Sequence, residues 1–406
     1  MKAKKASLPL LFSVVFMDMV GFGFIIPLIP DYIHNFGGAP ALAGLLMASY
    51  ALGQFFAAPI VGRLSDRYGR KPLLLFSIGG TFLSLLLLGF ARSLPLIFAS
   101  RILDGLTGGN ITVAQSYIVD ITDDKNRAKG FGIIGMAFGF GFIIGPVFGG
   151  LLSGFGLSAP AFVAAGIAAV NLALIAFALP ESLSSDRKDD LTRNPRRAFS
   201  AALLLETLRR KGTGTVLQMS MVYSFAFTLF ESMFALFAAE ALGVGPSERG
   251  WLLAYVGVLV ALVQGGGVGL LAKRFDERKL AAVSISVAAV SLALYSLSPS
   301  VPTLMLALAP LSLGSGVAST MLRTLLTKSV SKESSGGTLG LAASIDSVNR
   351  ILAPLAGGAI LASIGPRAPG LIAAALAGAT ALYAWKRLVR EDCLSTDAAT
   401  GSCEEA

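Results

Sequence analysis

The chain has 406 residues, of which 54% are hydrophobic and only 14% charged, and its mean hydropathy is +0.73. Soluble proteins carry about 25% charged residues, so this composition excludes a soluble globular protein. Apolar runs recur along the whole chain, and each is about long enough to cross a hydrocarbon core of about 30 Å. The sequence therefore predicts an all-α integral membrane protein that lies in the lipid bilayer.

Charged or Gly- and Pro-containing breaks divide the chain into predicted transmembrane helices. They cover residues 8–30, 41–61, 72–91, 94–121, 130–154, 160–180, 213–241, 249–271, 280–298, 301–327, 337–364 and 368–388. The single long connection, 181–212, is polar and basic. We therefore expect twelve transmembrane helices in two six-helix bundles, 1–180 and 213–389, joined by a cytoplasmic linker (181–212) and followed by a cytoplasmic tail (390–406).

The distribution of basic residues predicts the orientation in the membrane. Nearly all Lys and Arg outside the spans lie at the termini and in the even-numbered connections, whereas the odd-numbered connections hold only Arg92, Arg249 and Arg367. Cytoplasmic loops carry this excess, so both termini and the linker are expected in the cytoplasm. The same rule explains the net charge of +9, and nucleic-acid binding is not needed to account for it. Because the loops and the tail are short, we expect a bacterial inner membrane.

A repeat relates the two halves of the chain. Gly62–Lys71, between the second and third spans, has a counterpart in Gly269–Lys279, and Gly145–Gly150 in the fifth span has one in Ala353–Gly358. Two halves of the same topology are related by an axis along the membrane normal, so the bundles are pseudo-symmetric. Transporters of this kind bind a substrate between the repeats near the midplane.

Two carboxylates lie inside spans without a basic neighbour in sequence. Asp18 is midway along the first span and Glu231 midway along the seventh. An ionisable group in a span costs about 2.5–3.5 kcal/mol on insertion scales, which makes both candidates for proton binding or substrate contact. The alternative is a structural carboxylate that bonds to a neighbouring hydroxyl or backbone group.

Two further clusters inside spans pair opposite charges. Arg101 and Asp104 are three residues apart in the fourth span, and Asp346 and Arg350 are four apart in the eleventh. Both spacings place the two side chains on one helical face, where they can form an ion pair. A coupling or anion-binding role and a purely structural pair are both open for the first cluster, and a gating role and a structural pair for the second.

The fifth span has a backbone pattern of its own, Gly141, Gly145, Pro146, Gly149 and Gly150. The proline removes one helical hydrogen bond, and the glycines permit a bend and close packing against a partner helix. The chain holds no phosphate-binding loop, metal-ligand cluster or Ser/His/Asp set, so we expect no enzyme activity, cofactor or metal. Without a nucleotide site, uphill movement of a substrate must use an ion gradient.

These motifs resemble those of the major facilitator superfamily along essentially the whole chain. Gly62–Lys71 resembles its loop signature, Arg101–Gly105 its fourth-helix motif, and Gly141–Gly150 the fifth-helix motif of its antiporters. The resemblance narrows to the twelve-helix drug:proton antiporters, and most of all to the tetracycline-efflux branch. The motifs that carry this closer resemblance are Asp18 with Gly21, Gly23 and Pro27, then Tyr117–Thr122 and Leu179–Ser182.

The resemblance implies a monomeric transporter that exports amphipathic drug-like molecules by rocker-switch alternating access, driven by inward proton flow. Asp18 and Arg101 would serve coupling or substrate contact. The implied cytoplasmic gate consists of Gly62, Asp66, Arg67, Gly69, Arg70, Lys71 and Arg274. One position departs from the tetracycline pumps, because Ser84 stands where they carry an acidic residue in the third span. Glu231 and Asp346 would replace that charge and suit a cationic or zwitterionic substrate.

Two other functions remain open from the sequence. The first is a proton symporter or facilitator for an organic anion or metabolite, with Arg101 and Arg350 as the anion contacts. The second is a membrane receptor or scaffold that transports nothing. A receptor or scaffold would favour long soluble appendages. Its activity would not change when Asp18 or Glu231 is neutralised.

Overall fold

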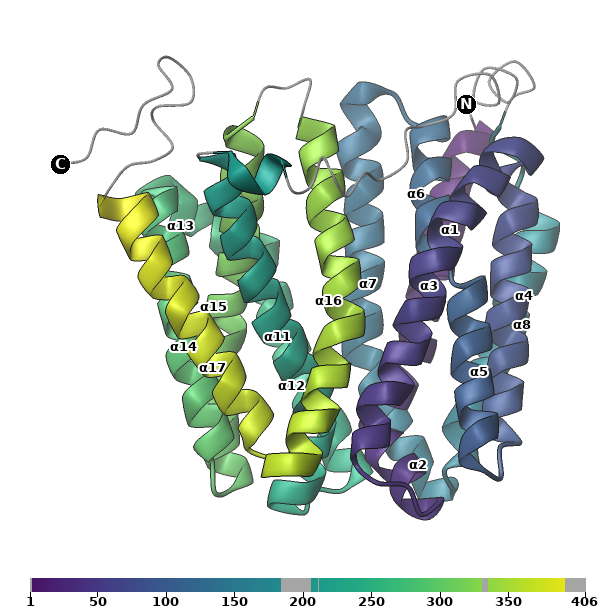
Figure 1. Ribbon diagram of the computed structural model, residues 1–406. Coiled ribbons are helices and arrows are strands. Elements are labelled where there is room, and N and C mark those ends of the chain that lie inside the picture. Colours follow the sequence, from purple (N-terminus) through teal and green to yellow (C-terminus); the bar gives the residue numbers. More distant parts are fainter. Residues whose placement is uncertain (1, 184–205, 211, 331–334, 391–406) are drawn as a thin grey trace. The chain divides into compact units, whose positions relative to one another are not determined.

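In a computed structural model, described for residues 2–183, 206–210, 212–330 and 335–390, every regular element is a helix (Figure 1). Most of the predicted linker, 181–212, and nearly all of the predicted tail, 390–406, lie outside these residues. The described part thus confirms the predicted all-α class.

The helices of the first half follow the predicted spans closely. They are α1 (Lys2–Ile25), η1 (Ile26–Leu28), α2 (Ile29–Asn35), α3 (Ala41–Tyr68), α4 (Arg70–Gly89), α5 (Leu94–Thr107), α6 (Asn110–Ile121), α7 (Asp124–Leu152), η2 (Ser153–Phe155) and α8 (Ser158–Ala178).

The second half repeats this agreement, with two short π-helical turns, η3 and η4. Its helices are α11 (Thr213–Leu242), α12 (Pro246–Leu262), η3 (Val263–Gly267), α13 (Val268–Arg274), α14 (Glu277–Leu297), α15 (Val301–Lys328), α16 (Ser335–Ile364), α17 (Ala368–Ala384) and η4 (Trp385–Arg390).

Eleven helical segments among the described residues are long and apolar enough to cross a membrane. The predicted span 94–121 is not one of them, because it is divided into α5 and α6. The break lies at Gly108 and Gly109, and a Cβ atom at Gly108 would lie 3.1 Å from the carbonyl oxygens of Asp104 and Gly105. The prediction of one continuous helix here was wrong, since two consecutive glycines favour leaving the helical conformation.

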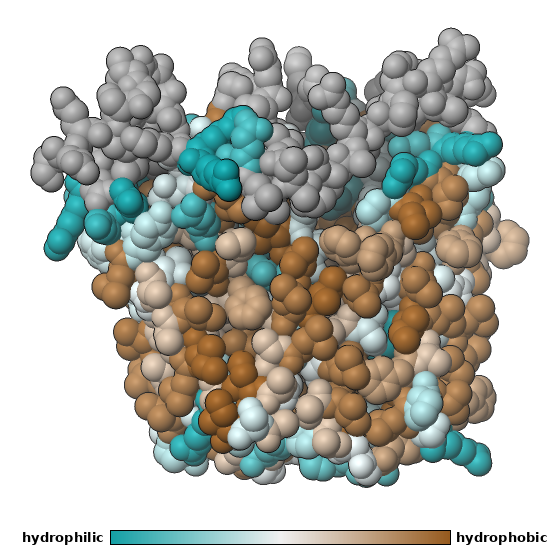
Figure 2. Space-filling model, in the orientation of Figure 1, coloured by the Kyte–Doolittle hydropathy of each residue, from teal (hydrophilic) through white to brown (hydrophobic). Residues whose placement is uncertain are grey.

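Side chains are distributed along the helices as a bilayer requires. On the face shown in Figure 2, hydrophobic residues cover the middle of the helices and hydrophilic residues gather at their ends. Large apolar side chains such as Phe56, Phe177 and Leu306 are more than half exposed. Soluble monomers rarely expose such extended apolar surface, whereas lipid accommodates it at no cost.

The chain folds into two compact units. Unit 1 comprises Met1–Arg197 with Gly243–Tyr255, and unit 2 comprises Ala198–Leu242 with Val256–Ala406. In unit 1, α1 packs along α7 and α8, α4 along α5 and α8, and α3 along α5. In unit 2, α14 packs along α15 and α17, and α11 along α16 and α17. The first ten residues of α12 therefore belong with unit 1, although the sequence places them in the second half.

Glycines bring α7 and α1 into close contact inside unit 1. A Cβ atom added at Gly145 would lie 2.9 Å from the Cα atom of Gly23, and one added at Gly141 would lie 2.5 Å from the Cβ atom of Met19. The backbones can approach this closely because two glycines face each other at Gly145 and Gly23, while Gly141 leaves room for the Met19 side chain. The pattern Gly141–Gly150 therefore acts in packing, and Pro146 lies within the continuous helix α7.

Gly62 and Gly69, the two glycines of the first gate loop, lie in different backbone conformations. α3 runs through Gly62 to Tyr68, so Gly62 is a helical residue and not part of a turn. The reversal into α4 takes place at Gly69 alone, where φ is +111°. Only glycine adopts this backbone conformation readily, so a single residue joins the two helices.

We predict that Gly145→Ala lowers the free energy of unfolding by about 1–3 kcal/mol, because the added methyl group forces α7 away from α1. The measurement is thermal unfolding of the purified protein in detergent. Gly139→Ala is the matched control on the same helix, since a Cβ atom there meets nothing within 4 Å. Equal melting temperatures for the two variants would contradict the packing role.

Candidate functional site

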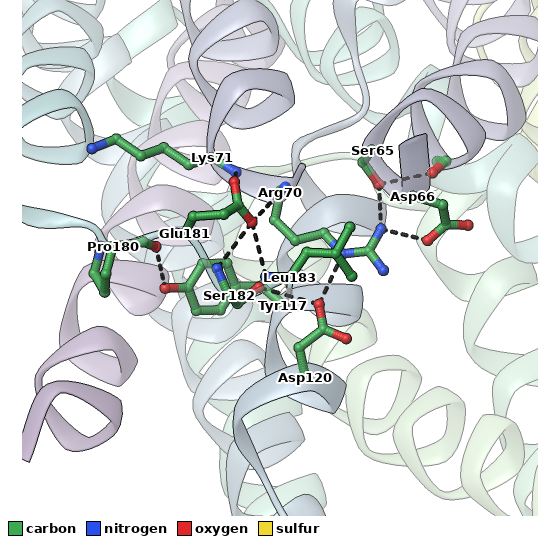
Figure 3. A network of polar contacts seen from close by, with 11 residues as sticks. Ser65, Asp66, Arg70, Lys71, Tyr117, Asp120, Pro180, Glu181, Ser182 and Leu183 are labelled. Atoms are coloured by element: carbon green, nitrogen blue, oxygen red, sulfur yellow. Dashed lines mark hydrogen bonds and ion pairs between the residues drawn. The ribbon is translucent and has the colours of Figure 1, made fainter. Parts of the chain in front are cut away.

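A buried arginine organises one end of unit 1. Arg70, the first residue of α4, is 1% exposed. Its Nη1 atom lies 2.5 Å from Asp66 and donates a hydrogen bond to Ser65 at 2.7 Å, while its Nε atom donates to Asp120 of α6 at 2.9 Å (Figure 3). Two carboxylates and a hydroxyl thus surround one guanidinium, which ties the end of α3 to α6.

Glu181 holds the same turn from the other side (Figure 3). Its Oε1 atom accepts a hydrogen bond from the backbone N–H of Arg70 at 2.9 Å, and Oε2 accepts one from Lys71 at 3.0 Å. These N–H groups are the unpaired donors at the start of α4, where the helix dipole favours a negative charge. A Cβ atom at Gly69 would lie 2.6 Å from this carboxylate, so the turn requires glycine for space as well as for conformation.

The segment after α8 is fixed at three points. Besides the Glu181 contacts, the Tyr117 hydroxyl donates to the Pro180 carbonyl at 2.6 Å, and the Ser182 hydroxyl donates to Asp120 at 3.1 Å. The motif Leu179–Ser182 carried no assigned role in the sequence analysis. The sequence feature that could have indicated a role for this motif is an acidic residue that follows a proline directly after a transmembrane span.

Of the other residues of the predicted gate, Lys71 joins this network only through its backbone N–H, and Arg67 and Arg274 lie outside it. The Arg67 guanidinium stacks 5.4 Å from the centre of the Tyr68 ring, and Lys71 contributes its backbone N–H. Arg274 is the exposed last residue of α13. In this second copy of the loop, Asp276 caps its own helix, α14, by accepting from the N–H groups of Arg278 and Lys279.

The interior of unit 1 contains one paired and one unpaired carboxylate. Arg101, 5% exposed, donates from Nη1 to Asp104 at 3.2 Å, as its spacing predicted. Ser84 of α4 donates its hydroxyl to the Thr81 carbonyl at 2.9 Å. Asp18 is half-buried and, among the described residues, accepts one hydrogen bond, from Asn110 Nδ2 at 2.9 Å. Asp104 is thus neutralised by a cation, and Asp18 has only a neutral partner.

The predicted ion pair between Asp346 and Arg350 was wrong. Asp346 of α16 accepts from the Ser224 hydroxyl at 2.6 Å and lies 3.6 Å from Arg323 of α15. Partners on two neighbouring helices replace the one expected on its own helix. Arg350 is exposed, and its charge acts on Glu231 of α11, which is half-buried. In unit 2, Glu231 therefore lies within electrostatic range of Arg350, which the sequence predicted as a partner of Asp346.

Another buried arginine, Arg249, was expected in an external connection. It is instead 1% exposed and its Nη2 atom lies 2.5 Å from Asp31 of α2. Next to it, a Cβ atom at Gly150 would lie 2.6 Å from the Pro246 carbonyl oxygen, so the first turn of α12 packs directly on α7. No local pattern in the sequence indicated this pair, because its members are 218 residues apart.

Comparison with known proteins identifies the family. The family model described as "Major Facilitator Superfamily" matches residues 11–233 and 216–400. The chain belongs to the major facilitator superfamily. It is a multi-pass membrane transporter, and not an enzyme, as the sequence predicted. Within the described residues, no group of three or more His, Cys, Asp or Glu could hold a metal ion.

Two relatives of this superfamily member are named for drug resistance. The class C tetracycline resistance protein of Escherichia coli is 32% identical over 374 residues, which cover 89% of this chain and 91% of that protein. Multidrug resistance protein 2 of Bacillus subtilis (strain 168) is 29% identical over 274 residues, 67% of this chain and 68% of that protein. The predicted resemblance to the tetracycline-efflux branch is thereby confirmed.

A solved structure shares the fold at much lower identity. A bacterial homologue of the human lysosomal transporter Spinster, in an inward-facing and occupied conformation, superposes with a TM-score of 0.80 at 16% identity, covering 96% of this chain and 97% of that chain. This likeness supports the superfamily fold.

We predict that Glu181→Gln destabilises the protein by about 1–2 kcal/mol, because a charged acceptor at the start of α4 is replaced by a neutral one. Thermal unfolding of the purified protein measures the loss. The control is Glu206→Gln, whose carboxylate is 65% exposed in its pair with Arg210 and should contribute almost nothing. A Glu181→Gln protein as stable as this control would show that the carboxylate contacts do not hold the turn.

Proposed function

We propose that this transporter is a proton-coupled antiporter that exports cationic or zwitterionic amphipathic molecules across a bacterial inner membrane. In this proposal α5 and α6 together form the span needed for twelve transmembrane helices in two six-helix bundles. Both termini lie in the cytoplasm, and the protein acts as a monomer. The names of the two drug-resistance relatives support export, and alternating access is the cycle that the superfamily resemblance implies.

The observation that carries the proposal is a difference between two carboxylates of unit 1: Asp104 has a cationic partner and Asp18 has none among the described residues. Arg101 is paired with Asp104 at 3.2 Å, whereas Asp18 has no cationic partner among the described residues. A bare carboxylate inside a membrane protein is costly, so Asp18 has to bind either a proton or a cationic group. These two ligands exclude each other on one carboxylate, which is the requirement for exchanging a proton for a positively charged substrate.

The charge of Arg101 is balanced by Asp104, although its buried Nη2 atom has no hydrogen-bond partner among the described residues, and this balance favours a positively charged substrate over an organic anion in unit 1. Glu231 in unit 2 would supply a second acidic contact for a positively charged substrate, moderated by the charge of Arg350. The Asp66–Arg70–Asp120 network would form part of the cytoplasmic gate. The α1–α7 crossing would be a rigid element within its bundle, since its backbones are too close to slide past one another.

We predict that Asp18→Asn abolishes substrate-dependent proton movement while the protein still folds and inserts. The experiment uses proteoliposomes with a pH-sensitive dye, an imposed proton gradient and a panel of cationic, zwitterionic and anionic amphiphiles. Asp123→Asn is the control, because Asp123 only caps the exposed start of α7 and asparagine caps a helix equally well.

Dissipation of the gradient by cationic or zwitterionic compounds, absent in Asp18→Asn and intact in Asp123→Asn, is the expected result. A response to anions alone would favour a symporter or facilitator and overturn the proposal. A wild-type protein that is silent across the panel would also overturn it, and would leave the receptor or scaffold class open.

We predict that Glu231→Gln weakens the apparent affinity for a monocationic substrate about fivefold to tenfold, because one acidic contact is lost. A neutral analogue of similar size should be affected less than twofold. Transport kinetics in the same proteoliposomes give the KM values, and equal losses for the two compounds would remove Glu231 from substrate contact.

A further inference from the structure

The polar end of α17 in unit 2 carries several basic residues. The π-helical turn η4 continues α17 and holds Lys386, Arg387 and Arg390. Lys386 and Arg390 are exposed, whereas the Arg387 guanidinium lies 6.0 Å from the centre of the Tyr383 ring. Figure 2 shows hydrophilic residues at this end of α17, at the upper left, above a hydrophobic surface. Positive charge and apolar surface therefore adjoin each other here.

Helix α14 lies antiparallel to α17 and contacts this turn. The Nε1 atom of Trp385 in η4 donates a hydrogen bond to the Ser286 hydroxyl of α14 at 3.1 Å. At the other ends of the two helices, a Cβ atom at Gly370 would meet the side chain of Ser296. Residue numbers therefore fall along α14 in the direction in which they rise along α17 and η4. Residues before Ser286 and residues after Trp385 extend towards the same polar end of unit 2.

Three exposed basic residues, which we call the basic cluster, are placed beside this contact: Lys279, Lys386 and Arg390. Lys279 precedes Ser286 by seven residues, which is two turns of α14, so the two lie on one face of the helix. Arg390 follows Trp385 by five residues, which is one π-helical turn, and Lys386 directly follows Trp385. Trp385 is itself 38% exposed, and tryptophan is enriched where the hydrocarbon of a bilayer meets the headgroups.

Exposed apolar side chains continue both helical faces away from the polar end. Val283 follows Lys279 by four residues on α14, and Leu382 precedes Lys386 by four residues on α17. Each of them therefore lies one turn from a basic residue, nearer the middle of its helix. Val283 is 45% exposed and Leu382 is 74% exposed. In a bilayer these two side chains contact acyl chains just beneath the headgroups.

The acidic residues at this end of α14 are engaged by other groups. Asp276 accepts hydrogen bonds from backbone N–H groups of its own helix, and Glu277 forms an ion pair with Lys328 at 2.7 Å. Among the residues that the structure describes, no carboxylate forms an ion pair with Lys279 or Arg390. The basic cluster therefore keeps a positive charge towards its surroundings.

Unit 1 has the opposite charge at the corresponding place. There the segment after its last helix, α8, holds Glu181, which accepts hydrogen bonds from the N–H groups of Arg70 and Lys71 at the start of α4. In unit 2 the helix α14 corresponds to α4, and its start is capped by its own Asp276. The turn η4 is thus not needed to cap α14, and its charges are directed to another partner.

We propose that the basic cluster binds the phosphate group of an anionic phospholipid, whose acyl chain lies along Val283 and Leu382. The occupant is a lipid because phosphate and hydrocarbon are joined in one molecule, in the same order as the cationic and apolar residues of the two helices. A soluble anion would use the basic cluster alone. Basic residues grouped at a membrane surface attract anionic lipids. The site goes beyond the proposed function, since proton-coupled export does not require it.

Trp385 serves as the reporter of the bound lipid. The chain has two tryptophans, so Trp251→Phe leaves Trp385 as the only one. The full-length Trp251→Phe protein is reconstituted in phosphatidylcholine bilayers, so that the acidic Glu391 and Asp392, which lie outside the described residues, are present. Acyl-brominated phosphatidylglycerol or acyl-brominated phosphatidylcholine is then added in equal steps. Bromine quenches tryptophan fluorescence only at close range, so the ratio of the two quenching curves gives the lipid preference at Trp385.

The test variant in this background is Lys386→Gln/Arg390→Gln, and Lys279→Gln is a second one in case the double variant does not fold. The control is Arg63→Gln/Lys129→Gln, which removes the same charge from exposed positions of α3 and α7. At low salt we expect a preference of about fivefold for phosphatidylglycerol in the starting protein, because several cations act on one headgroup. The preference should fall below about twofold in the double test variant and stay unchanged in the control.

Equal quenching by the two lipids in the starting protein would overturn the proposal, and so would a preference that survives in the test variants. An equal loss of preference in the control would also overturn it, since the overall positive charge would then be the cause. Reversal of the preference by inorganic phosphate, beyond the effect of chloride at the same ionic strength, would assign the basic cluster to a soluble anion and overturn the lipid site. No transport is measured, so the proposed function stands or falls separately.

Discussion

A charge placed among apolar side chains in a bilayer has to be neutralised nearby, and this requirement explains the ion pairs inside the protein. Arg101 pairs with Asp104, Arg249 with Asp31, and Asp346 is held by Ser224 and Arg323. Asp18 is the exception in unit 1, because its one hydrogen-bonding partner among the described residues is the neutral Asn110. The exception is informative because the buried Arg70, Arg101 and Arg249 of unit 1 each have a carboxylate partner.

The same requirement shapes the polar end of unit 1, where it acts on backbone groups. The start of α4 presents unpaired N–H groups, and Glu181 accepts hydrogen bonds from two of them. The Arg70 guanidinium forms ion pairs with the carboxylates of Asp66 and Asp120. One glycine makes the turn between α3 and α4, so the helix ends, the guanidinium and the segment after α8 meet in a small volume. Local backbone geometry and long-range electrostatics are therefore satisfied by the same few residues.

Sequence reasoning succeeded where the signal is local. Apolar run length predicted nearly every helix, and the three-residue spacing of Arg101 and Asp104 predicted their pairing, because both depend on neighbours within one or two turns. It failed for Asp346, whose partners come from two other helices, and for Arg249, whose partner is 218 residues away. It also assigned one helix to 94–121, since hydropathy alone does not register a break made by two small apolar glycines.

The chain does not divide into independent parts at its long polar linker, because Gly243–Tyr255 packs with unit 1. A fragment ending at the linker would lack Arg249, and Asp31 would lose its cationic partner. The glycine surface of α7 around Gly150 would also lose the turn of α12 that covers it. The two halves, produced as separate polypeptides, would therefore have to associate before the first could complete its fold.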